Sequence, residues 1–323
     1  MWPIAFPSPQ FFDWSGESMK ESIHKYFKVG LIAFMAYPGM LRGEAPDTLE
    51  LLKKVAVDDY FDAIEVTWIK DAETRKKAAA LLEQSHLTVG YGAQPRLLTT
   101  GMNANHLDET ERAKAEATLM EAIDEARELG AKGIAFLSGK WEKETQEQAY
   151  AQLLKTTRSL CDYAKTKDMC VELEVFDFDI AKASLIGPAP LAAKFAADMR
   201  STHSNFGLLI DLSHIPMCYE SAEFVVRTLR PYLTHFHIGN TVCTDPAHEG
   251  YGDDHQRFGF PNGSNDVDEL LEFLRVLKSE GFFCADNPYM LSFEVKPWQD
   301  EEPDIVVANA KRVLNRAWAL LED

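Results

Sequence analysis

Residues 233–240, with the sequence LTHFHIGN, place His235 and His237 two positions apart in a short apolar run that ends at Gly239. In a β-strand, residues i and i+2 share a face, so both imidazoles are expected to point the same way. Three other short apolar runs also lead to an acidic residue: 170–177 (CVELEVFD), 207–214 (GLLIDLSH) and 290–297 (MLSFEVKP). Together the four runs predict strand ends that bring carboxylates and a histidine to one point.

Strand-like and helix-like segments alternate along the rest of the chain. The expected strands are 28–37, 61–68, 87–91, 132–137, 170–175, 207–211, 233–238 and 290–295, and the expected helices are 47–57, 71–84, 108–129, 143–166, 191–199, 221–229, 267–280 and 303–321. Strict alternation implies parallel strands joined by right-handed crossovers, and eight such units in roughly 300 residues fit a closed (β/α)8 barrel, the TIM barrel. No GxGxxG follows the first strand, which counts against a dinucleotide-binding sheet. We therefore predict an α/β protein with a single (β/α)8 barrel domain over residues 1–323 and an irregular N-terminal extension at about 1–27.

The composition is that of an ordinary globular protein with a strongly acidic charge balance. The 323 residues are 46% hydrophobic and 26% charged, and the net charge is −18. This charge argues against nucleic acids and anionic membranes as partners. The five cysteines show no CxxC spacing, as expected of free thiols in a reducing compartment. We find no signal-peptide pattern and no run near the ~20 apolar residues of a membrane helix, so we expect a cytoplasmic protein.

Catalytic groups of a (β/α)8 barrel sit at the carboxyl-terminal ends of its strands. Glu174, Asp211, His237 and Glu294 fall there on four consecutive expected strands. Any one of them alone could be a structural group, but acids at three strand ends are costly to bury unless they are paired or bound to a cation. Three carboxylates and an imidazole suit octahedral Mn²⁺, Mg²⁺ or Co²⁺ better than a closed tetrahedral zinc site, although zinc stays possible. We expect a divalent metal ion, with Mn²⁺ as the first choice.

The motifs LEVFD, DLSH, HFHIGN and SFEVKP resemble those of the xylose-isomerase-like TIM-barrel superfamily, and within it the sugar (phosphate) isomerase/epimerase branch that includes the ketose 3-epimerases. The resemblance runs from about residue 28 to the C-terminus and is specific in the second half. It implies Glu174, Asp211, His237 and Glu294 as metal ligands and the two glutamates as the catalytic acid/base pair. It also implies His214 as a substrate contact and a homo-oligomer, either a dimer or a tetramer.

The sequence departs from the epimerases in the loop after the seventh strand. The resemblance places a substrate-binding arginine six residues beyond the metal histidine, where this chain has Cys243. His255 and Arg257, further along the loop, are the substrate-binding candidates instead. At the end of the second strand, Glu65 and Trp68 are candidates to line the pocket, with core packing as the alternative for Trp68.

Two further residues share a strand face with predicted ligands. Glu172 lies two residues before Glu174, and His235 lies two residues before His237. Each should lie one layer deeper in the barrel, where a structural or ligand-orienting role is expected rather than metal binding.

These residues favour a metal-dependent sugar isomerase or epimerase that abstracts a proton alpha to a carbonyl through a metal-stabilised enediolate. The alternative is a metal-dependent lyase or dehydratase acting on a keto-sugar, a keto-inositol or an oxidised glycoside, with His255 as proton donor. Endonuclease IV, of the same superfamily, is disfavoured because the second and third strands lack its histidines. A non-catalytic binding protein would need the four ligands to be vestigial. The expected partner is a small carbohydrate, and the lack of an obvious phosphate-binding glycine loop favours an unphosphorylated one.

Overall fold

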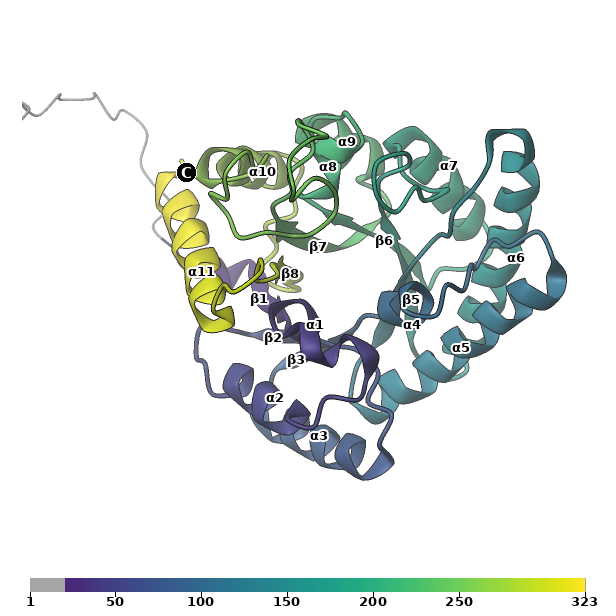
Figure 1. Ribbon diagram of the computed structural model, residues 1–323, viewed down its shortest axis with the longest axis horizontal. Coiled ribbons are helices and arrows are strands. Elements are labelled where there is room, and N and C mark those ends of the chain that lie inside the picture. The colour runs from purple at the N-terminus through teal and green to yellow at the C-terminus, as the bar shows by residue number, and fades with distance from the viewer. Residues whose placement is uncertain (1–20, 323) are drawn as a thin grey trace, which may run out of the picture.

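Eight of the apolar segments form parallel strands of one sheet, which curls into a barrel with helices around it (Figure 1). The computed structural model describes residues 21–322. The strands are β1 (Phe27–Ile32), β2 (Ala63–Val66), β3 (Thr88–Tyr91), β4 (Gly133–Leu137), β5 (Cys170–Val175), β6 (Phe206–Asp211), β7 (Leu233–Gly239) and β8 (Tyr289–Glu294). Hydrogen-bonded neighbours follow the order β3-β2-β1-β8-β7-β6-β5-β4, so the predicted (β/α)8 barrel is confirmed. The predicted extension at 1–27 falls mostly on residues outside the described part and stays a prediction.

The barrel closes only partly between β3 and β4, which we call the β3–β4 seam. Within residues 21–322 no continuous ladder joins these two strands. A single parallel bridge pairs Gly92 with Ala135, and the amide of Ala93 donates to the carbonyl oxygen of Ala135 at 2.7 Å. The barrel is therefore nearly closed, and its weakest edge lies at this seam.

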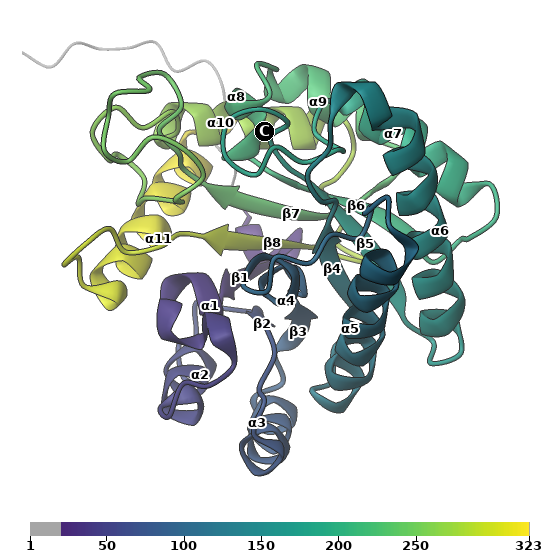
Figure 2. The ribbon, with the colours of Figure 1, turned by 45° about the vertical axis from the view of Figure 1, so that its right-hand side comes forward.

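Amphipathic helices cover the outside of the barrel (Figure 2). They are α2 (Thr48–Ala56), α3 (Ala72–Ser85), α5 (Glu109–Glu128), α6 (Gln146–Lys165), α7 (Ala189–Arg200), α9 (Ala222–Leu229), α10 (Val267–Ser279) and α11 (Pro303–Leu320). Their apolar faces are fully buried at residues such as Leu52, Phe195 and Phe273. Acidic and hydroxyl residues cap several of their first turns; Asp108, for example, accepts from the backbone amides of Thr110 and Glu111. The predicted alternation of strands and helices is thus present throughout.

Short helical segments lie in the connections between the main elements, and the sequence patterns did not predict them. They are η1 (Ile23–Lys25), α1 (Ala33–Ala36), η2 (Pro38–Arg42), α4 (Gln94–Leu98) and α8 (His214–Met217). A further short segment, η3 (Lys143–Thr145), begins the helix predicted over 143–166 and leads directly into α6. The apolar run 28–37, predicted as one strand, is divided between β1 and α1, because a continuous apolar run fits a buried strand or a buried helix equally well. In the described part of the chain, the helices are too short or too polar to cross a bilayer.

Candidate active site

Three of the four predicted ligands meet at the carboxyl-terminal mouth of the barrel. Glu174 lies near the end of β5, His237 lies in β7, and Glu294 is the last residue of β8. Nδ1 of His237 lies 2.8 Å from Oε2 of Glu294 and 3.5 Å from Oε1 of Glu174. One ligand atom from each side chain lies within 4.8 Å of the other two, and all three side chains are buried. This separation is short enough for the three to bind one ion.

The register of the sheet accounts for this convergence. Asp211 stands beside His237 on adjacent strands, and Gly239 stands beside Glu294. A Cβ atom at Gly239 would lie 2.4 Å from the carbonyl oxygen of Glu294, so glycine is what allows β7 and β8 to approach at this height. The apolar run LTHFHIGN therefore ends in a glycine for a steric reason.

Asp211, the fourth predicted ligand, belongs to a neighbouring group with His214 and His255. Its Oδ1 accepts from the amide of Ser213 at 2.9 Å, and its Oδ2 accepts from the hydroxyl of the same serine. Oδ2 also lies 3.5 Å from Nδ1 of His255 and 3.8 Å from Nε2 of His214. The serine in the motif DLSH thus holds the carboxylate in place.

The two groups adjoin through their histidines. Nε2 of His255 lies 3.5 Å from Oε1 of Glu294, and Nδ1 of His214 lies 3.8 Å from Oε1 of Glu174. Because both imidazoles are buried between carboxylates, the structure gathers the predicted ligands and the two predicted histidines into one cluster.

The long loop after β7 folds back into the barrel mouth and brings a further acid, Asp253. This carboxylate is buried and lies 2.8 Å from Nε2 of His255, 3.1 Å from Nε2 of His214 and 2.6 Å from Nζ of Lys182. The backbone of His255 is left-handed, with φ of 49°, and its carbonyl oxygen accepts from the amide of Lys296 at 2.7 Å. This uncommon conformation for a non-glycine residue turns the imidazole into the site.

Gln94, the first residue of α4, reaches the site from across the β3–β4 seam. Its Nε2 donates to Oε2 of Glu174 at 2.6 Å. Within the described residues, Oε1 of Gln94 and Oε1 of Glu174 are buried and have no hydrogen-bond partner. Buried polar atoms are normally paired, so a ligand or ion bound at this place would supply the partner that these two oxygens lack.

A chain of alternating carboxylates and imidazoles lies beneath the cluster, inside the barrel. His235 lies 3.2 Å from Glu172 through Nδ1 and 3.0 Å from Glu65 through Nε2. The same Oε1 of Glu65 lies 3.1 Å from Nε2 of His237. Glu65 therefore holds the ring nitrogen of His237 that faces away from Glu174 and Glu294, an arrangement that orients a metal-binding histidine.

Burial and the neighbouring charges shift the pKa values of the groups in this cluster in opposite directions. Burial lowers the pKa of His237, but the charges of Glu65 and Glu294 outweigh burial and hold that pKa well above its ordinary value. Burial raises the pKa of Glu65, yet the charges of His235 and His237 hold it well below its ordinary value. For Glu294, burial is the larger effect and raises the pKa. Without a bound cation, the buried carboxylates are thus balanced by protonated imidazoles.

A cavity of about 370 Å³ opens above Glu174, His237 and Glu294, and we call it the reaction cavity. Its other polar lining residues are Arg42, Gln94, Thr99, Lys182, Asp253, Asp254, His255 and Lys296, and its apolar ones are Ile32, Phe34, Met35, Leu41, Pro95, Leu98 and Phe176. Ligand pockets commonly have about 300–1,000 Å³, so this volume suits a small molecule of sugar size.

The comparison with protein families gives a match over most of the chain. The family model described as xylose isomerase-like TIM barrel matches residues 54–310. The chain belongs to this family. A search of curated proteins finds no match to its sequence.

Several solved structures share the xylose isomerase-like fold at low sequence identity. D-psicose 3-epimerase from Clostridium cellulolyticum H10 is 16% identical with a TM-score of 0.66, over 92% of this chain and 100% of that one. The 3-keto-D-glucoside 4-epimerase YcjR from E. coli is 15% identical with a TM-score of 0.63, over 90% and 99% of the two chains. The IolI protein with a bound zinc atom is 16% identical with a TM-score of 0.68, over 90% and 98%. At these identities the likeness is one of fold.

In this xylose isomerase-like chain, the reaction cavity is lined by His255, but the other four predicted substrate contacts, Glu65, Trp68, His214 and Arg257, are absent from its lining. Glu65 lies beneath His237, and His214 lies against Asp253. The indole Nε1 of Trp68 donates to the carbonyl oxygen of Leu41 at 2.7 Å, and the cation of Lys70 lies over its ring. Nε of Arg257 donates to Glu301 at 2.8 Å, and its Nη1 donates to the carbonyl oxygen of Gly259 at 3.2 Å. Among the residues that line the cavity, neither Trp68 nor Arg257 is present. The cations that face the cavity are instead Arg42, Lys182 and Lys296.

The sequence patterns did not single out Gln94, Lys182 or Asp253. Gln94 follows a strand end but lies in a short helix that no periodicity predicted. Lys182 and Asp253 meet across 71 positions of sequence and come from two irregular loops. The run GDDHQR, which puts two acids just before His255, was the one available signal for Asp253.

Proposed function

We propose that this protein is a divalent-metal-dependent sugar isomerase or epimerase that moves a proton on the carbon next to a carbonyl group. The observation that carries the proposal is the pair of buried carboxylates, Glu174 and Glu294, which both lie within 3.5 Å of Nδ1 of His237 at the reaction cavity. Paired acid and base groups that reach one small cavity suit proton removal and return within a single bound molecule.

The donor set fits a divalent ion. Glu174, Asp211, His237 and Glu294 would hold it, because they supply carboxylate oxygens and one imidazole, and because Oε1 of Glu174 has no hydrogen-bond partner within the described residues. When bound, the ion supplies Lewis acidity to a carbonyl oxygen and a neighbouring hydroxyl. We propose Mn²⁺ as the first choice, with Mg²⁺, Co²⁺ and Zn²⁺ as further candidates.

The two glutamates divide the proton transfer. Oε2 of Glu174 accepts a hydrogen bond from Gln94, which fixes the carboxylate in place, and Glu174 accepts the proton alpha to the carbonyl. Glu294 then returns a proton to the opposite face for epimerisation, or to the neighbouring carbon for isomerisation. At the end of one exchange Glu174 carries the proton taken from the substrate and Glu294 is ionised, so Glu174 must release a proton to solvent and Glu294 must take one up before the next turnover.

The surrounding residues bind substrate and exclude water. His255 lines the reaction cavity, and we propose it as a substrate contact. The resemblance to the epimerases suggests the same role for His214, but its ring nitrogens lie 3.2 Å from the carbonyl oxygen of Val175 and 3.1 Å from Asp253, so we propose that it positions Asp253. Phe34 and Phe176 form apolar walls of the reaction cavity. We further propose a carbohydrate partner, a cytoplasmic location and a homo-oligomer, which follow from the sequence expectations and the family.

A deuterium-exchange experiment tests the proposal. The protein is incubated with Mn²⁺ and a panel of ketoses in D₂O, and the label on the carbon next to the carbonyl is followed by NMR. We expect exchange with at least one ketose, accompanied by an epimer or an aldose. Glu294→Gln should remove product formation; unchanged turnover in this variant would refute the assignment of Glu294.

A second candidate, elimination, is favoured by the position of His255. This imidazole is buried 3.5 Å from Glu294 and 2.8 Å from Asp253, where it could protonate a leaving group beta to the abstracted proton. The same D₂O reactions decide between the two, since elimination yields an unsaturated product with loss of water or an aglycone, whereas isomerisation keeps the mass of the sugar apart from the label.

A further inference from the structure

A second cavity adjoins the reaction cavity at the barrel mouth, and we call it the side cavity. It has about 430 Å³, slightly more than the reaction cavity. Leu98 and Lys182 line both cavities, so the two spaces meet at these side chains. Nothing in the proton transfer proposed above uses the side cavity.

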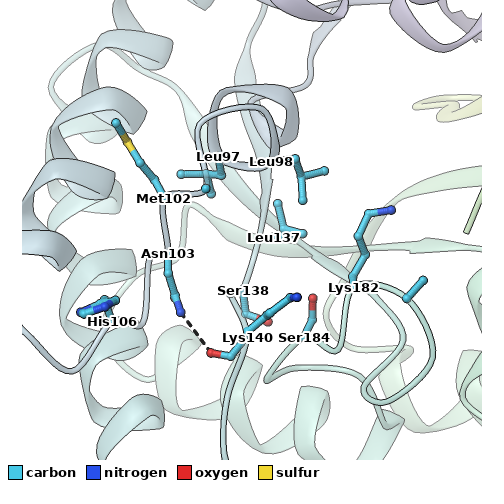
Figure 3. A pocket seen from close by; sticks show the side chains of 13 residues that line it. Leu97, Leu98, Met102, Asn103, His106, Leu137, Ser138, Lys140, Lys182 and Ser184 are labelled. Carbon is cyan, nitrogen blue, oxygen red and sulfur yellow. Dashed lines mark hydrogen bonds between the residues drawn. The ribbon is translucent and has the colours of Figure 1, made fainter.

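Three separate connections build the side cavity. Leu97, Leu98 and Met102 come from the segment that follows β3, Leu137 and Ser138 come from the end of β4, and Lys182 comes from the loop after β5. Figure 3 shows Lys182 and His106 at opposite sides of this space, with the leucines between them. A site formed by βα connections opens on the same face as the catalytic cluster, where a barrel binds its ligands.

The lining combines apolar surface with hydroxyl and amino groups and contains no carboxylate. Ser184 is almost fully buried, with 1% of its surface exposed, and within the described residues its Oγ has no hydrogen-bond partner. An unpaired buried hydroxyl is uncommon in a folded protein and is readily explained by a ligand group that completes it. Lys140, nearby on the rim, adds an amino group.

Lys182 is fixed at the junction of the two cavities. Its Nζ lies 2.6 Å from the buried carboxylate of Asp253, which itself contacts His214 and His255. The boundary of the side cavity is therefore tied directly to the catalytic cluster. A molecule that occupies both spaces must pass this ion pair.

We propose that the side cavity binds a second sugar ring, so that the substrate is a glycoside or disaccharide whose reacting ring lies in the reaction cavity. The inference rests on the function proposed above. A phosphate group would leave most of this volume empty and would lie against the apolar side chains of the lining. A ring with carbon faces and hydroxyl edges matches both the volume and the mixed lining.

This substrate class constrains the reaction sequence. A glycosidic bond blocks the anomeric carbon of the reacting ring, so the required carbonyl must be a ketone at another ring carbon. The reaction that supplies this substrate is therefore a dehydrogenation of a ring hydroxyl. The alcohol is oxidised by loss of a hydride and a proton, and a nicotinamide- or flavin-type acceptor of a separate enzyme takes the hydride.

The test compares three glucosides that carry a ketone at ring carbon 3: the methyl glycoside, its 6-phosphate and the corresponding disaccharide. The rate of deuterium uptake next to the ketone is measured as kcat/KM with Mn²⁺ present. We expect the disaccharide to exceed the methyl glycoside by about tenfold or more, because binding of a remote group raises kcat/KM.

Two variants test whether the preference for the disaccharide over the methyl glycoside arises in the side cavity. Ala181→Trp fills the side cavity from an exposed position and should bring the ratio of disaccharide to methyl glycoside close to one. Ala80→Trp is the matched control, because Ala80 is also exposed but lines a cavity near the start of the strands, at the other end of the barrel. It should keep the ratio of the unmodified protein.

Three results would overturn the inference. They are equal rates for disaccharide and methyl glycoside, an equal loss for both substrates in Ala181→Trp, or a larger gain from the 6-phosphate than from the second ring. Each of these leaves the proposed function standing, because deuterium is still taken up. Failure of every ketone substrate, including the ketose panel, would instead refute the proposed function and this inference with it.

Discussion

The two halves of the barrel differ in what they bring to the site. Strands β5 to β8 supply Glu174, Asp211, His237 and Glu294 near their ends, and each of these strands is joined to the next by a ladder, with one register shift between β6 and β7. Strands β1 to β4 supply no predicted ligand. Their contribution is Glu65 beneath His237, together with the short helices α1 and α4, whose side chains form walls of the reaction cavity.

The difference indicates separate roles for the two halves. The half whose strands are all joined by ladders fixes donor atoms to within the few ångströms that metal binding and proton transfer require. The half with short helices and the β3–β4 seam shapes the space in which the substrate lies. Changes at the strand ends of the second half should therefore affect chemistry, and changes in the first half should affect stability, orientation and substrate choice.

The largest expected effect is on the rate of proton transfer, when a glutamate in the second half of the barrel is replaced. Glu174→Gln removes the carboxylate proposed as the base and should lower deuterium exchange by about 10²–10⁴-fold at saturating Mn²⁺. Glu172→Gln is the matched control on the same strand, because Glu172 contacts Thr234 and His235 outside the reaction cavity. Its exchange rate should stay within severalfold of the unmodified protein. Equal losses in the two variants would contradict the division of roles.

A large effect on stability is expected in the first half. Nη2 of Arg96 in α4 lies 2.7 Å from Glu125 in α5, and both side chains are buried. Arg96→Met leaves the carboxylate buried without its main partner and should lower the free energy of unfolding by about 3–5 kcal/mol. Lys155→Met breaks the exposed pair with Glu109 and should cost about 0–1 kcal/mol. Denaturant titration measures both, and similar values for the two would refute the prediction.

A smaller effect, on metal affinity, is expected at Glu65, which lies in the first half of the barrel and contacts His237 of the second half. Glu65→Gln weakens the orientation of His237 and should reduce Mn²⁺ affinity by about 10–100-fold, with much of the exchange rate recovered at saturating metal. Asp62→Asn is the control, because Asp62 also contacts a histidine, His24, but away from the cluster. Calorimetric titration with Mn²⁺ gives the affinities. An unchanged affinity in Glu65→Gln would show that the first half does not support the metal site.

The smallest effect is the dependence of metal binding on pH. His237 has a pKa well above its ordinary value, so near neutral pH its imidazole is protonated before a metal binds. Metal coordination requires the neutral ring, so binding releases at least one proton and the affinity should rise about tenfold per pH unit. Calorimetry in buffers of different ionisation enthalpy counts the protons. Binding without proton release would argue against His237 as a ligand.

The sequence predicted the second half of the barrel more completely than the first. The strand ends at Glu174, Asp211, His237 and Glu294 could be located because a short apolar run before a polar residue is a local signal. Parallel topology then placed those ends at one mouth. The run 28–37 contained no such signal at its midpoint, so the turn from β1 into α1 was not predicted.

The loops account for the other differences. Lys182 and Asp253 form an ion pair that neither loop specifies alone, because it depends on how the chain after β7 folds back over the barrel. Arg257 was chosen by its position in the sequence after His237, but its guanidinium contacts Glu301 in the connection after β8. Irregular segments lack a period that would fix the direction of a side chain, so residues 240–266 could be recognised as important without assigning their contacts.

The β3–β4 seam has a mechanical consequence for ligand binding. Leu97 and Leu98 follow one edge strand of the seam, and Leu137 and Ser138 end the other, so the side cavity straddles the gap. Within the described residues, β3 and β4 are the one pair of neighbouring strands that no ladder of backbone hydrogen bonds joins. A ligand held between these walls would add contacts that connect the two strands. Occupancy should therefore slow amide hydrogen exchange at the facing edges of β3 and β4 more than elsewhere in the barrel.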